Sequence, residues 1–430
     1  MRFEHENLAT KVMDKKHEAS RVPEKENISK DRLPMMVVEY HDERSGANAY
    51  LVIDMLVNGV AGGGCRMKKG VTPEEMIKLA QTMTRKFTLT EPPTGGAKLG
   101  IDYDPARPDK LAVMQRVFEF LQAFLYNCYV TGADLNTNET EIITCTNAIG
   151  LPCPQYALAK RLGNAERRIQ RFYEGIHLKL DERGAMVMNA AATGYGICTA
   201  ALRAVSEHNL KGCSVALQGF GNVGGGLAKF LWDRGAKIQA LSDRFGVIYC
   251  KHGLDIDFLL ARRNERTKAI FPELLAATDR PAGYELIADP EIIYELGDDL
   301  FIPVADSGVI TEKNYKRIKA KYIICGSNDP FAPANIEEWL FELGKVVVPD
   351  FIANAGTAAL YHTLICEEGP VTVPGLLASV DRQIGAATDE ALAKARAEKI
   401  SPRRAAEIIA AEKINAYPAH YPTTISKRWV

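Results

Sequence analysis

Residues 213–243 constrain the fold more strongly than any other part of this 430-residue chain. The apolar segment CSVALQ has the length and composition of a buried strand, and it leads directly into the glycine-rich segment GFGNVG. A helical segment, GGLAKFLWDRG, and a second apolar segment, AKIQALSD, follow without interruption. A strand, a tight turn, a helix and a second strand form a βαβ unit with parallel strands. These residues therefore predict an α/β domain built on a parallel sheet.

Three glycines in the turn, Gly219, Gly221 and Gly224, form a G-x-G-x-x-G pattern between the predicted strand and helix. The first permits the tight turn, the second opens the backbone to a pyrophosphate, and the third lets the helix pack closely on the strand. The start of the helix adds unpaired N–H groups, which favour an anion. The pattern predicts a dinucleotide site, and a glycine-rich turn without a nucleotide is the alternative. The expected contacts are Gly219, Phe220, Gly221, Asn222, Val223 and Gly224.

The end of the second strand indicates which dinucleotide is bound. Asp243 lies 19 residues after Gly224, where a carboxylate accepts hydrogen bonds from the adenosine ribose and repels a 2′-phosphate. NAD is therefore the expected cofactor. Arg244 follows directly and would instead favour the 2′-phosphate of NADP, so NADP stays open as the alternative.

The rest of the chain predicts a second domain. The short apolar segments LFIPVA and YIICGS continue the doubly wound pattern, and the chain becomes helical again after about Ala358. The predicted fold is α/β with an N-terminal α/β substrate and oligomerisation domain, a Rossmann-type doubly wound dinucleotide-binding domain, and C-terminal helices that return to the first domain. The expected boundaries are a flexible arm over 1–33, the first domain over 34–190, the dinucleotide domain over 191–357 and the C-terminal helices over 358–430.

The first domain begins with two predicted strands, MVVEYHD and ANAYLVIDM, separated by a turn. A helix then starts with Thr72 as N-cap and Pro73 at its first position, and Glu75 is expected to complete a capping box.

Three further segments are assigned from their pattern. Residues 91–100 are expected to form a loop because of their prolines and glycines, and one long helix is expected from about 108 to 129. Residues 155–184 are helical in pattern but strongly charged, which predicts an excursion on the surface.

Composition excludes several classes of function. The 53 basic and 54 acidic side chains nearly cancel, so no strong field attracts nucleic acid or an anionic membrane, and a small-molecule partner is expected. The chain has no uncharged apolar run of about 18 residues and no signal-like start, so no membrane span or targeting segment is predicted. The nine cysteines form no CxxC pair and no zinc-like cluster, which predicts free thiols, no metal and a cytoplasmic location.

Three charged residues lie in apolar or glycine-rich sequence. Lys86 falls on the apolar stripe of its helix, where it either extends to the surface or is a buried cation that awaits a carboxylate. Lys98 lies in PPTGGAKLG, where glycines would let a ligand approach and a dry pocket would lower the lysine pKa toward the range useful for proton transfer. Asp134, in VTGADLNTN, is the matching carboxylate. Beside a dinucleotide site, the three together indicate catalysis.

Six motifs occur in a fixed order: GGGCRM (62–67), TMTRK with GGAK twelve residues later, GADLNTN, ATGYG (192–196), GFGNVG and PDFIANAG (349–356). In this order they resemble the glutamate/leucine/phenylalanine/valine dehydrogenases over roughly Met35 to Val380. The resemblance implies reversible, NAD(P)-dependent oxidative deamination of an L-amino acid to its 2-oxo acid and ammonia by a homo-oligomer.

The resemblance also implies roles for matching residues. Lys86 would hold the substrate α-carboxylate, Lys98 would activate the attacking water, and Asp134 would carry protons to and from the amino group. The residues that would position the nicotinamide and its ribose are Thr193, Asn328 and Asn354.

Two departures from the family pattern concern the substrate. Where glutamate enzymes of the family place a lysine and a serine, this chain has Gly62 and Tyr361, and no replacement cation is visible. A γ-carboxylate without a partner would be costly in such a pocket, so glutamate is not expected. In these positions the chain resembles the leucine/phenylalanine branch, and its small residues predict room for a bulky apolar or aromatic side chain. The expected substrate contacts besides Lys86 are Gly62, Gly63, Gly132, Ala358 and Tyr361.

Two other functions remain as alternatives at this stage. A Rossmann dehydrogenase for a different substrate class would need a His–Asp or Tyr–Lys pair, and none stands out in the sequence. A homologue that binds nucleotide as a regulatory subunit would have no need of Lys86, Lys98 and Asp134.

Overall fold

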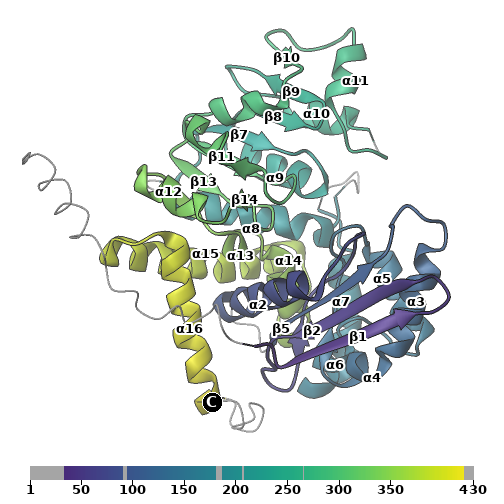
Figure 1. The fold of residues 1–430 in the computed structure, drawn as a ribbon. Coiled ribbons are helices and arrows are strands. Elements are labelled where there is room, and N and C mark those ends of the chain that lie inside the picture. Colours follow the sequence, from purple (N-terminus) through teal and green to yellow (C-terminus); the bar gives the residue numbers. More distant parts are fainter. Residues whose placement is uncertain (1–32, 91–93, 181–185, 206–207, 265, 421–430) are drawn as a thin grey trace, which may run out of the picture. The chain divides into compact units, whose positions relative to one another are not determined.

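The structure, a computed structural model, describes residues 33–90, 94–180, 186–205, 208–264 and 266–420. The arm predicted over 1–33 therefore lies outside the described residues, apart from Leu33. Two sheets organise the described chain, one in the first domain and one in residues 214–348 (Figure 1). The predicted two-domain α/β fold is confirmed.

The first sheet contains β1 (Met36–Asp42), β2 (Ala47–Ile53), β3 (Ala61–Gly62), β4 (Cys65–Met67), β5 (Gly95–Asp102) and β6 (Tyr129–Val130). The strand order is β1-β2-β5-β3-β6, and β4 also pairs with β5. Both predicted N-terminal strands are confirmed as β1 and β2, which pair antiparallel through a turn. Strand β1 forms one edge of this sheet (Figure 1).

The loop predicted over 91–100 is wrong, because β5 begins at Gly95 and is the central strand of the sheet. A strand that is buried on both faces shows no alternation of polar and apolar residues, so its glycines resembled a loop. Residues 91–93 lie outside the described residues.

The glycines of β5 allow other parts of this chain to pack closely against the strand. The sequence had predicted that they would allow a ligand to approach. A Cβ atom at Gly96 would lie 2.2 Å from the backbone nitrogen of Thr84 in helix α2 (Pro73–Thr90), and one at Gly95 would lie 1.9 Å from a backbone oxygen. At Gly100 a Cβ would lie 2.4 Å from the sulfur of Met76 in the same helix. Since side chains alternate along a strand, Lys98 lies on the same face as Gly96 and Gly100, toward α2.

Replacing Gly96 with alanine is expected to lower the free energy of unfolding by about 3 kcal/mol, because the new methyl group overlaps the α2 backbone. The measurement is chemical denaturation of the purified variant. Gly369→Ala is the matched control, since a Cβ there meets nothing within 4 Å. Equal loss of stability in both variants would contradict the close approach of α2 to β5.

Helix α2 begins where the sequence predicted. The hydroxyl oxygen of Thr72 accepts a hydrogen bond from the backbone nitrogen of Glu75 at 3.3 Å, as expected of an N-cap. The Glu75 carboxylate, however, bonds to Arg66 and Lys68, which gives it a role in the site described below.

The single helix predicted over 108–129 is wrong. Helix α3 (Lys110–Phe120) and helix α4 (Gln122–Asn127) are separated at Leu121, and the chain then enters β6. Leu121 and Leu125 are both buried in the core of the first domain, so tertiary packing outweighs the continuous helical pattern. Helix α5 (Glu139–Ala148) follows, with a capping box between Asn138 and Glu141.

Residues 155–180, the described part of the segment that was predicted to be a surface excursion, are instead packed into the fold. They form α6 (Tyr156–Leu162) and α7 (Ala165–Ile176), and α7 packs against α14 (Gly356–Cys366). Phe172 is fully buried, and Arg171 donates to the backbone oxygens of Leu364 and Gly369. The arginine thus satisfies carbonyl groups at the end of α14, which explains a charged sequence in a packed helix. Residues 181–185 lie outside the described residues.

The second sheet has the order β10-β9-β8-β7-β11-β13-β15. Strands β8, β7, β11, β13 and β15 are parallel, and β9 and β10 add antiparallel strands at one edge. The predicted βαβ unit is confirmed as β7, α9 and β8. The strands are β7 (Ser214–Gln218), β8 (Lys237–Asp243), β9 (Gly246–Tyr249), β10 (Glu285–Ile287), β11 (Leu300–Pro303), β13 (Tyr322–Ile324) and β15 (Val346–Val348).

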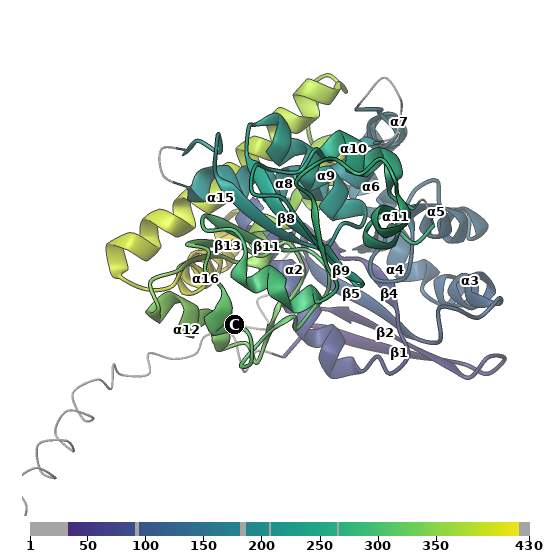
Figure 2. The ribbon, with the colours of Figure 1, turned by 90° about the horizontal axis from the view of Figure 1, so that it is seen from above.

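Both faces of the second sheet are covered, as the apolar segments predicted. Alternate residues of β7 enter different cores: Val215 and Leu217 face one, and Ala216 faces the other. Helices α8 (Met188–Ala204) and α9 (Asn222–Asp233) cover the first face, and α8 and α9 lie side by side (Figure 2). The remaining elements are α10 (Ile256–Arg262), α11 (Phe271–Ala276), η2 (Pro290–Glu295), β12 (Ile310–Thr311), η3 (Tyr315–Arg317), β14 (Phe331–Ala332), α12 (Ile336–Glu342) and α13 (Asp350–Ala353).

The C-terminal helices contact both domains. Helix α14 packs against α7 of the first domain and α8 of the second, α15 (Val373–Glu398) packs mainly on α8, and α16 (Pro402–His420) contacts α2 and β15. Figure 1 shows α15 and α16 in yellow beside α2 and α13.

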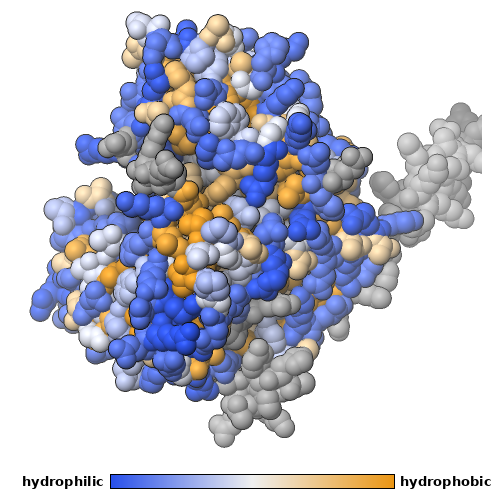
Figure 3. All heavy atoms as spheres, turned by 180° about the vertical axis from the view of Figure 1, so that it is seen from behind, coloured by the Kyte–Doolittle hydropathy of each residue, from blue (hydrophilic) through white to orange (hydrophobic). Residues whose placement is uncertain are grey.

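Figure 3 shows a mainly hydrophilic back face that is interrupted by an apolar area near its middle. The nine cysteines are free. Within the described ranges, no helix has the length and apolar character needed to cross a membrane. Among the same residues, no cluster of histidine, cysteine and carboxylate side chains is suited to hold a metal ion.

Candidate functional site

A cavity of about 490 Å³ is lined by residues of both domains. In the first domain, the lining residues come from β3, α2, β5 and the segment after β6. In the second domain, they come from the carboxyl ends of β11 and β13 and from the start of α9 and α14. Ligands of parallel α/β sheets bind at the carboxyl ends of the strands. Twelve residues predicted from the sequence line it: Gly62, Gly63, Lys86, Lys98, Gly132, Asp134, Thr193, Val223, Asn328, Asn354, Ala358 and Tyr361.

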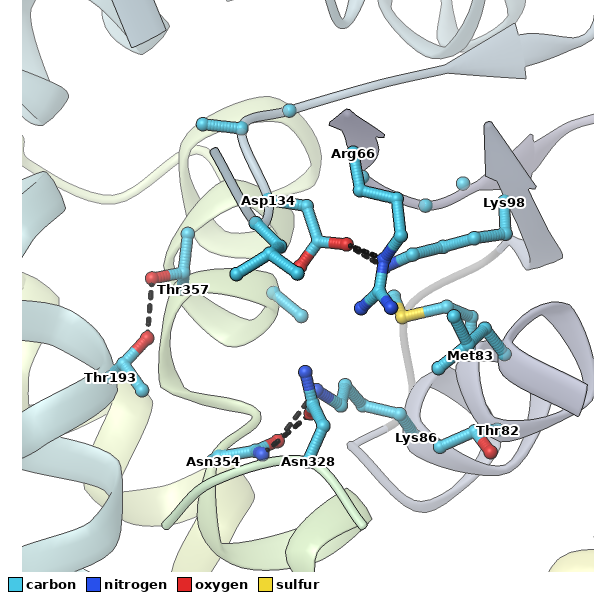
Figure 4. Close-up of a pocket in the computed structure, with 18 of the residues that line it drawn as sticks. Arg66, Thr82, Met83, Lys86, Lys98, Asp134, Thr193, Asn328, Asn354 and Thr357 are labelled. Atoms are coloured by element: carbon cyan, nitrogen blue, oxygen red, sulfur yellow. Dashed lines mark hydrogen bonds and ion pairs between the residues drawn. The ribbon is translucent and has the colours of Figure 1, made fainter. Parts of the chain in front are cut away.

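Asp134 and Lys98 form the centre of the site (Figure 4). The Lys98 Nζ atom lies 2.9 Å from Asp134 Oδ2, and Nε of Arg66 donates to the same oxygen at 2.8 Å. Although burial alone would raise it, Lys98 and Arg66 hold the pKa of Asp134 well below its usual range. Because both cations use Oδ2, Asp134 presents a charged carboxylate whose other oxygen has no such contact among the described residues.

Glycines bring this carboxylate close to the sheet. A Cβ atom at Gly64 would lie 2.8 Å from the Cβ of Asp134, and one at Gly63 would lie 1.7 Å from the Ala97 backbone oxygen. Only glycine at these two positions allows the Asp134 segment and β5 to approach so closely. The glycine-rich motif therefore positions Lys98 and Asp134 beside each other.

Lys86 reaches the opposite wall of the cavity. Its side chain is buried, and Nζ donates to Oδ1 of Asn354 at 2.6 Å, while Nδ2 of Asn354 donates to Asn328 Oδ1 at 2.8 Å. Burial, together with the charge of Lys98, lowers the pKa of Lys86 to about 8. Of the two interpretations of Lys86, the buried cation is therefore correct. Figure 4 shows Lys86, Asn354 and Asn328 grouped across the cavity from Asp134.

Thr193 lies on a third side of the cavity. Its hydroxyl is hydrogen-bonded to the hydroxyl of Thr357 at 2.8 Å, which links α8 to the start of α14. A Cβ atom at Gly356 would lie 1.9 Å from the Ala192 backbone oxygen, so glycine is needed for this helix contact. The ATGYG and PDFIANAG motifs, which the sequence analysis singled out, are thus in direct contact.

The glycine-rich turn has the geometry that its spacing predicted. Gly219 has φ of +104°, which favours glycine, and a Cβ atom at Gly224 would lie 2.1 Å from the Gly219 backbone oxygen. A Cβ at Gly221 meets nothing within 4 Å, so the backbone there is open to a ligand. Of the residues in this turn, Val223 lines the cavity, whereas Gly219, Phe220, Gly221, Asn222 and Gly224 lie outside its lining.

Asp243 and Arg244 lie at the end of β8, away from the cavity lining. Oδ2 of Asp243 accepts from the backbone nitrogens of Ile270 and Phe271, both at 2.8 Å. The Arg244 guanidinium lies over the ring of Phe245. Asp243 therefore also holds the chain before α11, a structural role that the sequence did not indicate.

The prediction that Gly62 leaves room for a large substrate is wrong. A Cβ atom there would lie 3.0 Å from the Phe87 ring and 3.1 Å from Val130, so side chains of this protein fill the space. Gly132 differs, because a Cβ there would only touch Tyr361, at 3.4 Å. The wall of this part of the cavity is therefore apolar and partly aromatic.

Sequence reasoning missed Arg66, Phe87 and His362, all of which line the cavity. A signal existed for Arg66, since it is a charged residue in the apolar strand β4, and it is 7% exposed. Phe87 and His362 lie beside the predicted residues Lys86 and Tyr361 on helices whose pattern suggested only core packing.

Comparisons with known proteins show which chains this one is similar to. A family model described as Glutamate/Leucine/Phenylalanine/Valine dehydrogenase matches residues 184–419, and one described as the dimerisation domain of Glu/Leu/Phe/Val dehydrogenase matches residues 34–149. The chain is 33% identical to a glutamate dehydrogenase of Aeropyrum pernix over 308 residues, which is 70% of this chain and 67% of that relative.

Two solved structures share the fold. A hetero-hexameric glutamate dehydrogenase from Thermus thermophilus in its leucine-bound form has a TM-score of 0.69 and 20% identity over 89% of each chain. An L-tryptophan dehydrogenase from Nostoc punctiforme has a TM-score of 0.59 and 18% identity, over 89% of this chain and 96% of the other.

Proposed function

Since this chain belongs to the glutamate/leucine/phenylalanine/valine dehydrogenase family, a family of NAD(P)-dependent oxidoreductases that act on CH–NH₂ groups, we propose that it oxidatively deaminates a bulky apolar or aromatic L-amino acid. The observation that carries this proposal is the convergence of Lys86, Lys98 and Asp134 on one cavity, part of whose wall is apolar. The products are the corresponding 2-oxo acid and ammonia, and the reaction is reversible.

Each charged residue has a separate role in binding or deprotonating the substrate. Lys86, held by Asn354, binds the α-carboxylate as an ammonium group. Asp134 takes a proton from the substrate amino group through the oxygen that Lys98 and Arg66 leave open. Lys98, paired with Asp134, first gives up a proton to solvent, and its neutral amine then takes the proton of the water that attacks the imine.

The second domain fits a nicotinamide dinucleotide. The open backbone at Gly221 and the start of α9 suit a pyrophosphate, and Thr193 and Asn328, which line the cavity, would hold the nicotinamide and its ribose. Ser327 Oγ is buried in the same wall without a hydrogen-bond partner among the described residues, as expected of a group that bonds to a ligand. When bound, the cofactor accepts the hydride from the substrate Cα. The charge of Asp243 favours NAD over NADP.

The apolar wall supports a substrate other than glutamate. Phe87, Val130, Leu158 and Ala358 line this wall. The cations in the described lining, Arg66, Lys86 and Lys98, are already bonded to Asp134, Glu75 or Asn354. A second substrate carboxylate would therefore be buried without a cation to pair with, which is strongly unfavourable.

A substrate panel tests this proposal. With NAD as cofactor, kcat/KM for phenylalanine or leucine is expected to exceed that for glutamate by on the order of 10²-fold or more, because the γ-carboxylate would be desolvated without compensation. NADH formation at 340 nm measures each rate, and the same panel with NADP compares the cofactors. A clear preference for glutamate would refute the assignment of the pocket.

We further propose that the first domain carries a homo-oligomer interface. Strand β1 has a free edge in the described sheet, and Met36 and Val37 on it are exposed. Phe120 of α3 is 46% exposed and stacks on Tyr40 of β1, with ring centroids 4.6 Å apart. Together they form an apolar surface on the domain whose family model is named for dimerisation.

Replacing Phe120 with glutamate is expected to shift the protein to a smaller assembly, because a charge would be buried at this surface. Size-exclusion chromatography with light scattering measures the mass. Leu275→Glu is the control, because Leu275 is 66% exposed on α11 of the other domain. An unchanged mass for Phe120→Glu would place the interface elsewhere.

A further inference from the structure

Helix α14 presents four residues to the cavity: Thr357, Ala358, Tyr361 and His362. The Thr357 hydroxyl is bonded to Thr193, and Ala358 has no polar group. The Tyr361 hydroxyl interacts with Asn189, whose side-chain nitrogen also donates to Glu139. Of these four residues, His362 is therefore the one whose polar side chain still has no hydrogen-bond partner assigned to it.

The imidazole of His362 is neutral and half-buried. Burial lowers its pKa to about 4. Its Nδ1 atom is enclosed and has no hydrogen-bond partner among the described residues. A buried N–H group without an acceptor is rarer than a buried acceptor without a donor, so the proton resides on Nε2. Nε2 is not among the enclosed atoms without a partner, and His362 lines the cavity, so Nε2 is the ring nitrogen that is open to a ligand.

The position of His362 matches the far end of a substrate side chain. Ala358 and His362 are four residues apart and share one helix face, so His362 lies about 6 Å, slightly more than one helical turn, beyond Ala358 along the helix axis. Helix α14 follows Asn354, which holds the carboxylate-binding Lys86. A side chain that extends from the reacting carbon along α14 therefore passes Ala358 before it reaches His362.

We infer that His362 is a specificity-determining residue, which donates a hydrogen bond from Nε2 to the phenolic oxygen of a para-hydroxylated aromatic amino acid such as L-tyrosine. This inference rests on the proposed function and names its substrate class. A phenyl ring has no acceptor at its end, and an indole N–H can only donate. Tyrosine is therefore favoured over both phenylalanine and tryptophan.

The test compares kcat/KM for tyrosine, phenylalanine and tryptophan with NAD in the wild type and in three variants. We expect the wild type to prefer tyrosine over phenylalanine by about 10-fold or more. His362→Phe keeps a ring without nitrogen and should bring the ratio of kcat/KM for tyrosine to that for phenylalanine down to about 1, and NADH binding by this variant reports correct folding. His362→Gln places an amide near the position of Nε2 and should retain part of the preference. His362→Asn places it near Nδ1 and should not.

His177→Phe changes a histidine outside the cavity lining, whose Nδ1 contacts the Tyr173 backbone oxygen, and should keep the wild-type ratio. Equal kcat/KM for tyrosine and phenylalanine in the wild type, or an unchanged preference in His362→Phe, overturns the inference and leaves the proposed function intact. Preference for glutamate over every aromatic substrate overturns the proposed function, and the inference falls with it.

Discussion

Replacing Asp134 with asparagine is expected to lower kcat on the order of 10³-fold, with cofactor binding preserved. The amide cannot accept the proton that the substrate amino group must lose before hydride departs. It also leaves Lys98 and Arg66, which both contact Asp134 Oδ2, without their shared anion. Steady-state rates with the preferred amino acid measure the loss, and NADH fluorescence titration checks that the cofactor still binds.

The control for Asp134 is a carboxylate in an ion pair outside the site. Asp279 pairs with Arg262 on the surface and is 62% exposed, so Asp279→Asn should leave kcat unchanged. A fall in kcat of less than about tenfold in Asp134→Asn would contradict a role in proton transfer, whose loss is normally larger.

Replacing Lys86 with methionine is expected to lower kcat/KM by about 10²- to 10³-fold, since losing one partner of a buried ion pair costs about 3–5 kcal/mol. Methionine keeps much of the side-chain volume in α2 but cannot bind the substrate carboxylate. Lys78→Met is the matched control, because Lys78 is exposed on the same helix. If both variants retain wild-type kcat/KM, Lys86 does not anchor the carboxylate.

The pKa of Lys86 gives an independent check on the same role. In the free protein this pKa is lowered to about 8, so Lys86 is charged below that pH and neutral above it. An anion that binds to the ammonium form should therefore bind fully below pH 8 and progressively more weakly as pH rises through it. The inhibition constant of 3-phenylpropanoate, which has a carboxylate and no amino group, should rise above about pH 8. A flat profile between pH 7 and pH 10 would contradict this assignment.

Features that depend on residues close together in the sequence were determined by the sequence alone. The order of strand, glycine turn, helix and strand specified the βαβ unit. The spacing of the glycines specified that Gly219 adopts the positive φ of the turn, that Gly221 leaves the backbone open and that Gly224 packs closely against the turn. Local backbone conformation and helix–strand packing within one unit arise from contacts a few residues apart, so a linear pattern encodes them. The motif order further identified Lys86 and Asp134 before any contact was known.

Contacts between distant segments were decided only by the tertiary structure. The bond between Lys86 and Asn354 joins residues 268 positions apart, and Arg66 reaches Asp134 across 68. The space vacated at Gly62 is taken by Phe87, so the volume of a pocket follows from what its neighbours place there and not from the size of one residue. The central strand β5 was mistaken for a loop for the same reason, because burial on both faces removes the alternation that a sequence pattern can detect.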